Sequence, residues 1–343
     1  MTPITSPNLH SERMHKGDQM PSIRKLGAAI AVMTLMVAAR SVCADEWPGH
    51  SISVVSPFAT GTTSETVAQT VLGPAGAQLG QPFVMENRPG HGGAAAVASV
   101  VKAAPDGYTF LLATSAMTAA VILHKSLPYD AVNDLTPVAM FAIEPSMLMA
   151  APGKGYNSVA DLVAAAKANP GTIKFGSVGV GSASYIAGER FRQLAGLTVG
   201  HVAYSGAAEA LANLTAGRID FYFVPVTPAL PLIVQGKGVA LAVSTPDRLQ
   251  SLPGLPTLKE SGYAIPYLSW CGLSAPAKTP AEIVNKLNHV IANALELPAV
   301  RTKLLRTGYV PAPMTAQQYA SFVADDIAAM TSLGKEAHIE PLD

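Results

Sequence analysis

The stretch ISVVSPFATGTTSETVAQTVLGPAGAQL, residues 52–79, sets the pattern on which the fold assignment rests. Its apolar start predicts a strand at 52–56. A loop of small and hydroxylated residues follows, and the next segment predicts a helix from Ser64 to Leu79. A strand, a polar loop and a helix in this order are typical of an α/β unit.

The same alternation continues along the rest of the chain and predicts an α/β fold. No unit recurs at a period of about 20–50 residues, which argues against a solenoid. Further strands are expected at 83–85, 110–113, 138–143, 147–151, 173–177, 200–203, 220–224, 239–243 and 270–275, and further helices at 92–103, 159–168, 185–194, 207–216, from 230, 280–295 and 316–330.

The composition fits a globular chain of about two domains, at roughly 150 residues per domain. The chain has 343 residues, of which 49% are hydrophobic and 13% are charged. The charged share lies well below the usual value of about 25%, which argues against a disordered chain. Lys and Arg together number 23, as do Asp and Glu, so no basic excess indicates nucleic-acid binding.

The N-terminal segment has the pattern of a secretory signal peptide. Basic residues at 24–25 precede an apolar run at 26–39, and small residues follow up to Ala44. The run is shorter than the about 20 apolar residues that a membrane-spanning helix needs. We therefore expect cleavage near Ala44 and export to the periplasm, with an uncleaved membrane anchor as the alternative. Either Met1 or Met20 could be the start of translation.

The sequence motifs of common catalytic and metal sites are missing. No H-E-x-x-H pair, G-x-S-x-G elbow or P-loop occurs. Gly179-Val180-Gly181 begins like a dinucleotide fingerprint, but Ser184 stands where the third glycine is needed. After cleavage Cys271 would be the only cysteine, and we expect it to be buried beside Trp270. We therefore expect no catalytic residue, no metal and no cofactor.

Four predicted strands end in loops that are rich in Gly, Ser and Thr and that lead towards helices. Small residues let a ligand approach the backbone, and the free N–H groups at a helix start favour an anion. Hydroxyl groups add donors without adding charge. We therefore predict an anion site built from Phe58, Ala59, Thr60, Gly61, Thr62, Thr63, Ser64, Thr114, Ser115, Ser177, Gly179, Gly181, Ser182, Ser184, Tyr204, Ser205, Gly206 and Ala207.

Helix capping is the alternative explanation for any one of these loops, since Ser and Thr are preferred N-caps. Thr62 and Glu65 fit a capping box, in which Glu65 folds back onto the backbone. Four such loops without a catalytic motif favour the anion site. Micromolar binding needs about 8 kcal/mol, and a hydrogen bond to a charged group contributes about 1.5–3 kcal/mol. About four or five donors therefore suffice without a salt bridge.

Taken in order, these loops and several other motifs resemble the Bug family, the extracytoplasmic solute-binding receptors of tripartite tricarboxylate transporters. The similarity covers nearly all of the chain after residue 44. The matching residues are Trp47-Pro48, Val55-Ser56-Pro57-Phe58 with Gly61, Glu86-Asn87-Arg88-Pro89-Gly90 with Gly92-Gly93, Pro105-Asp106-Gly107-Tyr108, Leu127-Pro128-Tyr129-Asp130, Gly188-Glu189, Tyr204 with Gly206, Leu255-Pro256-Thr257, Ser269-Trp270 and Ala275-Pro276.

This resemblance implies a two-lobed periplasmic binding protein of the second type, with the ligand in the cleft between the lobes. Lobe 1 would comprise 45–145 and 269–343, lobe 2 would comprise 146–268, and 1–44 would be the removed signal peptide. The resemblance also implies that the first loop grips a carboxylate, aided by ordered water. The loops of lobe 2 would then meet the distal part of the ligand.

Three departures from the family pattern concern the site. Thr62 stands where a second glycine is usual, and Glu65 stands where an aspartate is usual. Val224-Pro225 replaces the usual Asp-Asn, which makes the distal pocket more apolar and adds Val224 to the predicted site. We therefore expect a ligand with one carboxylate and an apolar or aromatic body.

The resulting hypothesis is a monomeric, non-enzymatic receptor in the periplasm that captures a small organic carboxylate and delivers it to a membrane permease. The alternative is an exported sensor subunit that signals ligand occupancy to a histidine-kinase partner. A hydrolase or transferase that acts on a carboxylated substrate is a third interpretation, which the missing motifs disfavour. No nucleic-acid partner is expected.

Overall fold

The computed structural model describes residues 47–90, 93–265, 269–336 and 341. The chain divides into 1–46 and the compact unit 47–343, to which all the described residues belong. The predicted signal peptide and its cleavage site near Ala44 lie outside the described residues. Across the described part, no helix combines the length and the apolar character that a membrane crossing requires.

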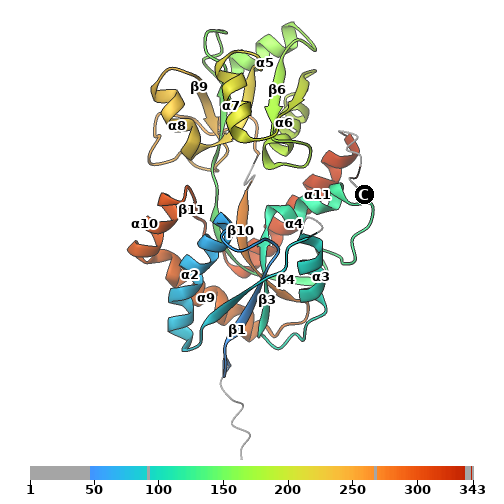
Figure 1. Ribbon diagram of the computed structural model, residues 1–343, viewed down its shortest axis with the longest axis vertical. Coiled ribbons are helices and arrows are strands. Elements are labelled where there is room, and N and C mark those ends of the chain that lie inside the picture. The colour runs from blue at the N-terminus through green and yellow to red at the C-terminus, as the bar shows by residue number, and fades with distance from the viewer. Residues whose placement is uncertain (1–46, 91–92, 266–268, 337–340, 342–343) are drawn as a thin grey trace, which may run out of the picture. The chain divides into compact units, whose positions relative to one another are not determined.

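The first of two sheets is formed by β1 (Ile52–Ser56), β2 (Phe83–Asn87), β3 (Thr109–Thr114), β4 (Leu135–Ile143), β10 (Trp270–Pro276) and β11 (Val310–Pro311). Its strand order is β11-β4-β10-β3-β1-β2 (Figure 1). β1 pairs in parallel with β2 and β3, so the carboxyl ends of these strands lie at the same edge of the sheet. β10 runs antiparallel between β3 and β4, and β11 pairs with β4.

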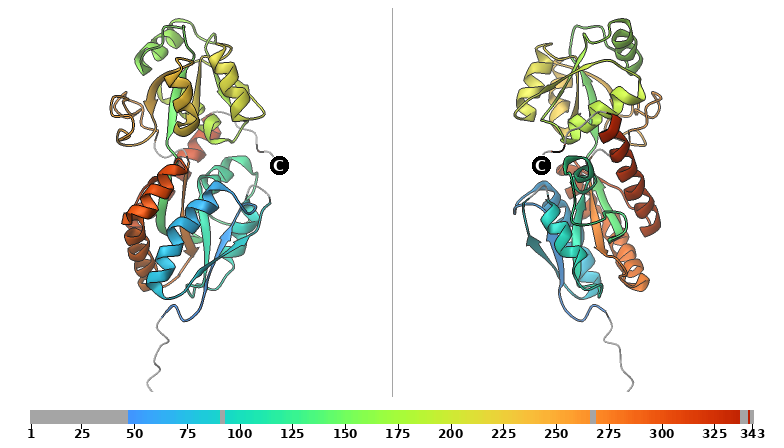
Figure 2. Two further views of the ribbon diagram at one scale, coloured as in Figure 1. Left: turned by 60° about the vertical axis from the view of Figure 1, so that its left-hand side comes forward. Right: turned by 90° about the vertical axis from the view of Figure 1, so that its right-hand side faces the viewer.

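Helices cover both faces of this sheet. They are α2 (Thr63–Leu79), α3 (Ala94–Val101), α4 (Ser115–Leu123), α9 (Ala281–Glu296), α10 (Pro298–Arg306) and α11 (Ala316–Glu336). Side chains of β1 alternate between the faces: Ile52 and Val54 pack with α2 and α9, whereas Val55 packs with α3. The left-hand view of Figure 2 shows α2, in blue, beside α9 and α10, in orange.

The second sheet is formed by β5 (Ser146–Ala150), β6 (Lys174–Ser177), β7 (Gly200–Ala203), β8 (Phe221–Pro225) and β9 (Val239–Val243). Its order is β7-β6-β8-β5-β9, with β6 parallel to β7 and β8. The helices of this half are α5 (Val159–Ala168), α6 (Ala183–Leu194), α7 (Ala207–Thr215) and α8 (Val226–Val234). Phe221 and Phe223 face α5 and α6, whereas Tyr222 and Val224 face α7 and α8.

Two sheets, each with its own buried cores, confirm the expected two-lobed α/β fold. The chain passes from β4 to β5 through Glu144 and Pro145, and it returns to the first sheet at Trp270. The two crossing segments are joined where the Glu144 N–H donates to the Ser269 carbonyl (2.9 Å). The exact lobe boundaries stay a prediction: 45–145 with 269–343 for lobe 1, and 146–268 for lobe 2.

Several elements differ from the sequence-based expectations. α4, α10 and β11 were not expected, α3 is shorter than 92–103, and α11 continues to Glu336. α4 has the sequence SAMTAAVIL and is mostly buried, so it lacks the polar face that makes a surface helix recognisable. Cys271 is buried beside Trp270, as expected, and burial raises the pKa of its thiol to about 12.

Candidate functional site

The loop between β1 and α2 is the first predicted contact region. Its backbone is held by Asn87, whose side-chain amide donates to the Phe58 carbonyl (3.0 Å). Gly61 has a φ of 89°, a conformation that favours glycine. Residues 59–61 are exposed. The loop therefore offers its backbone to a ligand at the start of α2.

Glu65 fixes this loop from inside the protein and is only 3% exposed. Its Oε2 accepts hydrogen bonds from the Gly61 N–H (2.8 Å) and from Asn87 Nδ2 (3.4 Å), and Gln69 Nε2 donates to Oε1 (3.3 Å). The predicted capping box is wrong in its detail, because Glu65 binds Gly61 and the Thr62 side chain caps no N–H group of α2. One predicted ligand donor, the Gly61 N–H, is thus already used.

The first turn of α2 supplies the other donors of this region. Thr63 is exposed and Ser64 is half-buried, and the Thr62 Oγ1 lies 3.3 Å from the Ser64 Oγ. The first N–H groups of a helix have no acceptor within the helix. Together with the helix dipole, they favour a carboxylate at this position.

The loop between β6 and α6 uses most of its polar groups internally. Ser182 Oγ accepts from the Tyr185 N–H (3.2 Å) and donates to the Gly179 carbonyl (2.6 Å). Ser184 is buried, and its Oγ accepts from the Val178 N–H (3.2 Å). For Ser182, the structure therefore shows a helix cap.

Ser177 is fully buried at the end of β6. Its Oγ lies 2.7 Å from His201 Nε2 and accepts from the Gly179 N–H (3.0 Å). Burial lowers the pKa of His201, whose ring packs against Phe175 and Tyr185. This neutral pair orders the loop and leaves the Ser177 hydroxyl little capacity for a ligand.

The loop at 204–207 shows a similar internal use of its donors. The N–H and the hydroxyl of Ser205 both donate to Glu209 Oε2 (3.0 and 2.7 Å), and these bonds lower the pKa of Glu209. Gly206 is the N-cap of α7, and Ala207 is its first residue. Tyr204 is half-buried.

Thr114 and Ser115 lie at the junction of β3 and α4. Thr114 is the buried N-cap residue, and its Oγ1 has no hydrogen-bond partner in the described part of the chain. The carbonyl of Ser115 accepts from the Thr118 hydroxyl (3.0 Å). Both residues therefore belong to the start of a helix that the sequence did not predict.

One cavity of about 380 Å³ brings two of the predicted loops together. Phe58 and Ala59 come from the loop after β1, and Gly181 comes from the loop after β6. The other residues that line it are Pro57, Pro89, Gly90, Gly93, Ala116, Ala119, Ala120, Leu123 and His124. The lining side chains are apolar except for the His124 imidazole. The remaining predicted residues lie outside this lining.

Gly181 is packed closely against the cavity wall contributed by α4. Its φ is 82°, and a Cβ atom there would lie 2.6 Å from Leu123 Cδ2. Only glycine fits both constraints without a shift of the neighbouring side chain. The sequence identified Gly181 as a glycine in a polar loop, but it gave no sign of the α4 residues that it contacts.

Val224 has a different place from the one predicted for it. It is fully buried in the core under α7 and α8, together with Met147 and Val243. It is absent from the residues that line the 380 Å³ cavity. Its apolar character is explained by this packing.

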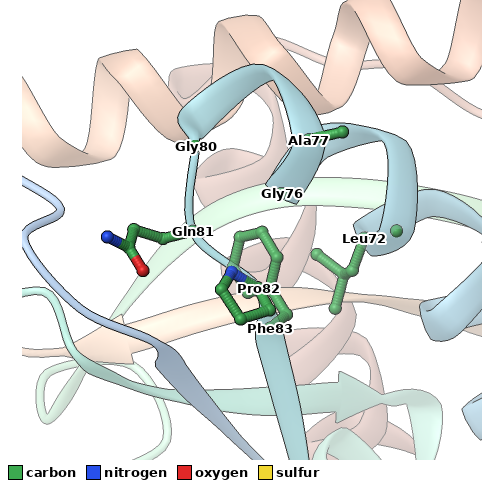
Figure 3. A pocket seen from close by; sticks show the side chains of 8 residues that line it. Leu72, Gly76, Ala77, Gly80, Gln81, Pro82 and Phe83 are labelled. Carbon is green, nitrogen blue, oxygen red and sulfur yellow. The ribbon is translucent and has the colours of Figure 1, made fainter.

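A second cavity, of about 400 Å³, lies at the opposite end of α2 from the loop at 57–62 (Figure 3). Leu72, Gly76 and Phe83 help to line it, and no ionisable side chain is among its lining residues. Within the described ranges, no three His, Cys, Asp or Glu side chains gather in a way that could hold a metal ion. The cavity between the two predicted loops is therefore the stronger candidate site.

Comparison with known proteins identifies the family of this chain. Residues 67–339 match the family described as "Tripartite tricarboxylate transporter family receptor". Protein BugT of Bordetella pertussis is 32% identical over 314 residues, which cover 90% of this chain and 96% of BugT.

Two solved structures share the fold. A protein of R. palustris with adipate is 32% identical and has a TM-score of 0.64, covering 87% of this chain and 100% of its own. A TctC solute binding protein from Polaromonas, with no ligand, is 25% identical and has a TM-score of 0.79, covering 84% and 99%. The expected resemblance and the periplasmic binding-protein fold are confirmed. This chain belongs to the receptor family of the tripartite tricarboxylate transporters.

Proposed function

We propose that this protein is a periplasmic receptor that binds a small carboxylate in the 380 Å³ cavity and delivers it to a membrane permease. The observation that carries the proposal is the meeting of Phe58, Ala59 and Gly181 around one cavity next to the start of α2. Membership of a transporter receptor family supports a role in transport, and the R. palustris protein that is 32% identical to this chain has been solved with adipate, a dicarboxylate.

The charges around the cavity favour recognition by backbone donors. No Lys or Arg side chain is among the lining residues, so a carboxylate would rely on backbone N–H groups. Residues 60–64 do not line the cavity, so the carboxylate end of the ligand would extend from it past Ala59 to the first turn of α2. His124 adds one imidazole at the far end of α4. Such donors supply the about 8 kcal/mol of micromolar binding when about four or five of them act together.

The apolar wall favours a ligand with an apolar or aromatic body. Ala116, Ala119, Ala120 and Leu123 form one face of α4 and offer no polar side-chain atom. A ligand hydroxyl or second carboxylate against this wall would lose hydration without gaining a partner. The class that fits best is therefore a carboxylate with one acidic end.

Binding would be coupled to the two-lobed fold. A ligand that contacts Phe58 and Gly181 touches residues of both predicted lobes. It stabilises whichever lobe arrangement lets both contacts form, and this arrangement would be the one that the permease recognises.

Calorimetric titration with hexanoate, benzoate, adipate and malate tests the proposal. We expect hexanoate or benzoate to bind most tightly and malate most weakly, because malate carries a hydroxyl and two carboxylates on a short chain. No binding of any of the four to a folded protein would overturn the carboxylate receptor. Tightest binding of malate would overturn the apolar-body assignment alone.

A further inference from the structure

Asp326, on α11, is a buried carboxylate that is bonded to three other elements. Its Oδ1 accepts from Arg190 Nη2 of α6 (2.8 Å), and the side chains of Arg190 and Asp326 are 9% and 4% exposed. Its Oδ2 accepts from the Thr118 hydroxyl of α4 (2.7 Å) and from Trp270 Nε1 of β10 (3.3 Å). Hydrogen bonds to a charged group are stronger than neutral ones, so these contacts hold the three elements to α11.

α4 forms one wall of the proposed carboxylate cavity with the face that carries Ala116, Ala119, Ala120 and Leu123. Thr118 and Ile122 lie on the opposite face, four residues apart, and both are buried. A Cβ atom on Gly334 of α11 would lie 2.6 Å from Ile122 Cγ2, so the two helices pack closely (Figure 1). The bond between Thr118 and Asp326 therefore fixes this wall against α11.

The part of the cavity that comes from predicted lobe 2 is attached to α6. Gly181 lines the cavity, and Ser182 beside it is the N-cap of α6. Arg190 lies about two turns further along this helix. Since α6 belongs to predicted lobe 2 and α11 to predicted lobe 1, the carboxylate of Asp326 holds both walls of the cavity.

Trp270 connects the same carboxylate to the crossing between the lobes. It is the first residue of β10 and follows Ser269, whose carbonyl accepts from the Glu144 N–H of the other crossing segment (2.9 Å). A rotation of one predicted lobe against the other at these segments would move α6 relative to α11. The ion pair between Arg190 and Asp326 opposes this movement.

Asp220 is a comparable carboxylate whose contacts stay within one predicted lobe. Its Oδ1 accepts from Lys154 Nζ (2.6 Å) and from the Tyr156 hydroxyl (3.3 Å), and its Oδ2 accepts from the Lys174 N–H (2.8 Å). Asp220 is 7% exposed, and all its partners lie within 146–268. It therefore provides a control in which a buried ion pair is lost but the two lobes are not released.

We infer that Asp326 is a positioning residue for carboxylate binding, which holds α4 and α6 at the separation that the ligand needs. This inference rests on the proposed function. Asp326 does not line the cavity and acts through Thr118 and Arg190. It raises the fraction of the protein in which a ligand can contact Phe58 and Gly181 at once, and the apparent affinity rises with that fraction.

Calorimetric titration with the tightest of hexanoate, benzoate, adipate and malate measures this contribution. Arg190→Met combined with Asp326→Asn removes both charges but keeps an acceptor for Thr118 and Trp270, so it releases α6 alone. We expect the dissociation constant to rise by about tenfold or more. Lys154→Met combined with Asp220→Asn, the matched control, should leave it unchanged. An unchanged dissociation constant in the first double variant, while folded, would overturn the inference.

Two substitutions of Thr118 test the contact with α4 separately. Thr118→Val removes the hydroxyl and should weaken binding by about threefold or more, whereas Thr118→Ser keeps the hydroxyl and should bind nearly as tightly as the unchanged protein. Equal weakening in both variants would assign the effect to packing and contradict the positioning role. This comparison decides the matter if the Arg190→Met, Asp326→Asn protein does not fold.

Small-angle X-ray scattering without ligand separates this inference from the proposed function. The folded Arg190→Met, Asp326→Asn protein should have a larger radius of gyration than the unchanged protein, and the Lys154→Met, Asp220→Asn protein should not. If none of the four carboxylates binds, the proposed function fails, and the scattering decides whether Asp326 holds the two walls together. Equal radii of gyration in all three proteins would contradict that role.

Discussion

The loops that precede α2 and α6 look alike in sequence but use their polar groups differently. Both follow a parallel strand, contain glycines with positive φ and lead into a helix. Before α6, the hydroxyls of Ser177, Ser182 and Ser184 all bond within the loop and the helix start. Before α2, the Thr62 side chain caps nothing, and a buried carboxylate from the helix holds the loop instead.

This difference shows that hydroxyl content alone does not identify a ligand site. A hydroxyl that caps a helix already has a hydrogen-bond partner. The N–H groups of an exposed loop and of an uncapped first helix turn can still donate to a ligand. The loop before α2 is therefore suited to grip a carboxylate. The loop before α6 is suited to provide a rigid wall through Gly181.

The largest effect is expected for Gly181→Ala. The left-handed conformation costs about 1–2 kcal/mol for a residue with a Cβ, and the overlap with Leu123 adds about 1 kcal/mol or more. Gly61→Ala has the same conformational cost but no neighbour within 4 Å of its Cβ. Urea unfolding should show the larger loss for Gly181→Ala, and Leu123→Ala added to it should restore only the steric part. Equal losses for the two glycines would contradict this packing.

The next effect concerns the carboxylate that fixes the first loop. Glu65→Ala leaves the Gly61 N–H without its acceptor and removes one of the two acceptors of the half-buried Asn87 amide, so we expect a loss of about 2 kcal/mol in the free energy of unfolding. Glu209→Ala is the matched control, because Glu209 also accepts from an N–H four residues earlier but is exposed. Its loss should be much smaller. A similar loss in both variants would show that the burial of Glu65 does not increase its contribution to the free energy of unfolding.

A smaller contrast is expected between two N-cap side chains. Ser182→Ala removes an observed cap bond and should cost about 1 kcal/mol. Thr62→Ala removes no cap bond, so its unfolding free energy should stay close to that of the unchanged protein. Chemical denaturation of both variants measures the difference. A larger loss for Thr62→Ala would reverse our account of the two loops.

The smallest effect is a pH dependence of stability at the loop 204–207. Hydrogen bonds from Ser205 lower the pKa of Glu209 below its ordinary value of 4.5. A carboxyl group with a lowered folded-state pKa stabilises the protein above its unfolded-state pKa, and this contribution is lost as the pH falls through the lowered value. Ser205→Ala should therefore lower the melting temperature slightly at pH 7, with the difference fading below the lowered pKa. A difference that grows on acidification would contradict the assignment.

The fold could be predicted wherever a local signal marks an element. The helix Val159–Ala168 was predicted with its observed bounds, and Ser158 caps it through the Asp161 N–H. The apolar strand Val239–Val243 was equally clear. α4 has no polar face, and the side chain of its N-cap residue Thr114 makes no cap hydrogen bond. Its position therefore depends on packing against distant parts of the chain, which a local sequence pattern does not reveal.

In the candidate site, too, only the residues marked by a local sequence signal could be predicted. Phe58, Ala59 and Gly181 were predicted because glycines and hydroxyls mark loops at helix starts. Ala119, Ala120 and Leu123 were missed, since apolar side chains in a cavity wall look like core residues in sequence. Ser177 and Ser184 show a second limit of the sequence, which cannot reveal that their hydroxyls are bonded internally.

The most direct test of a carboxylate receptor built on backbone donors is a crystal structure with the tightest carboxylate of the titration panel. We predict that one carboxylate oxygen accepts from N–H groups within residues 59–64, with the apolar body against α4 and in contact with Gly181. A ligand bound elsewhere, or one held mainly by Lys or Arg side chains, would contradict this account.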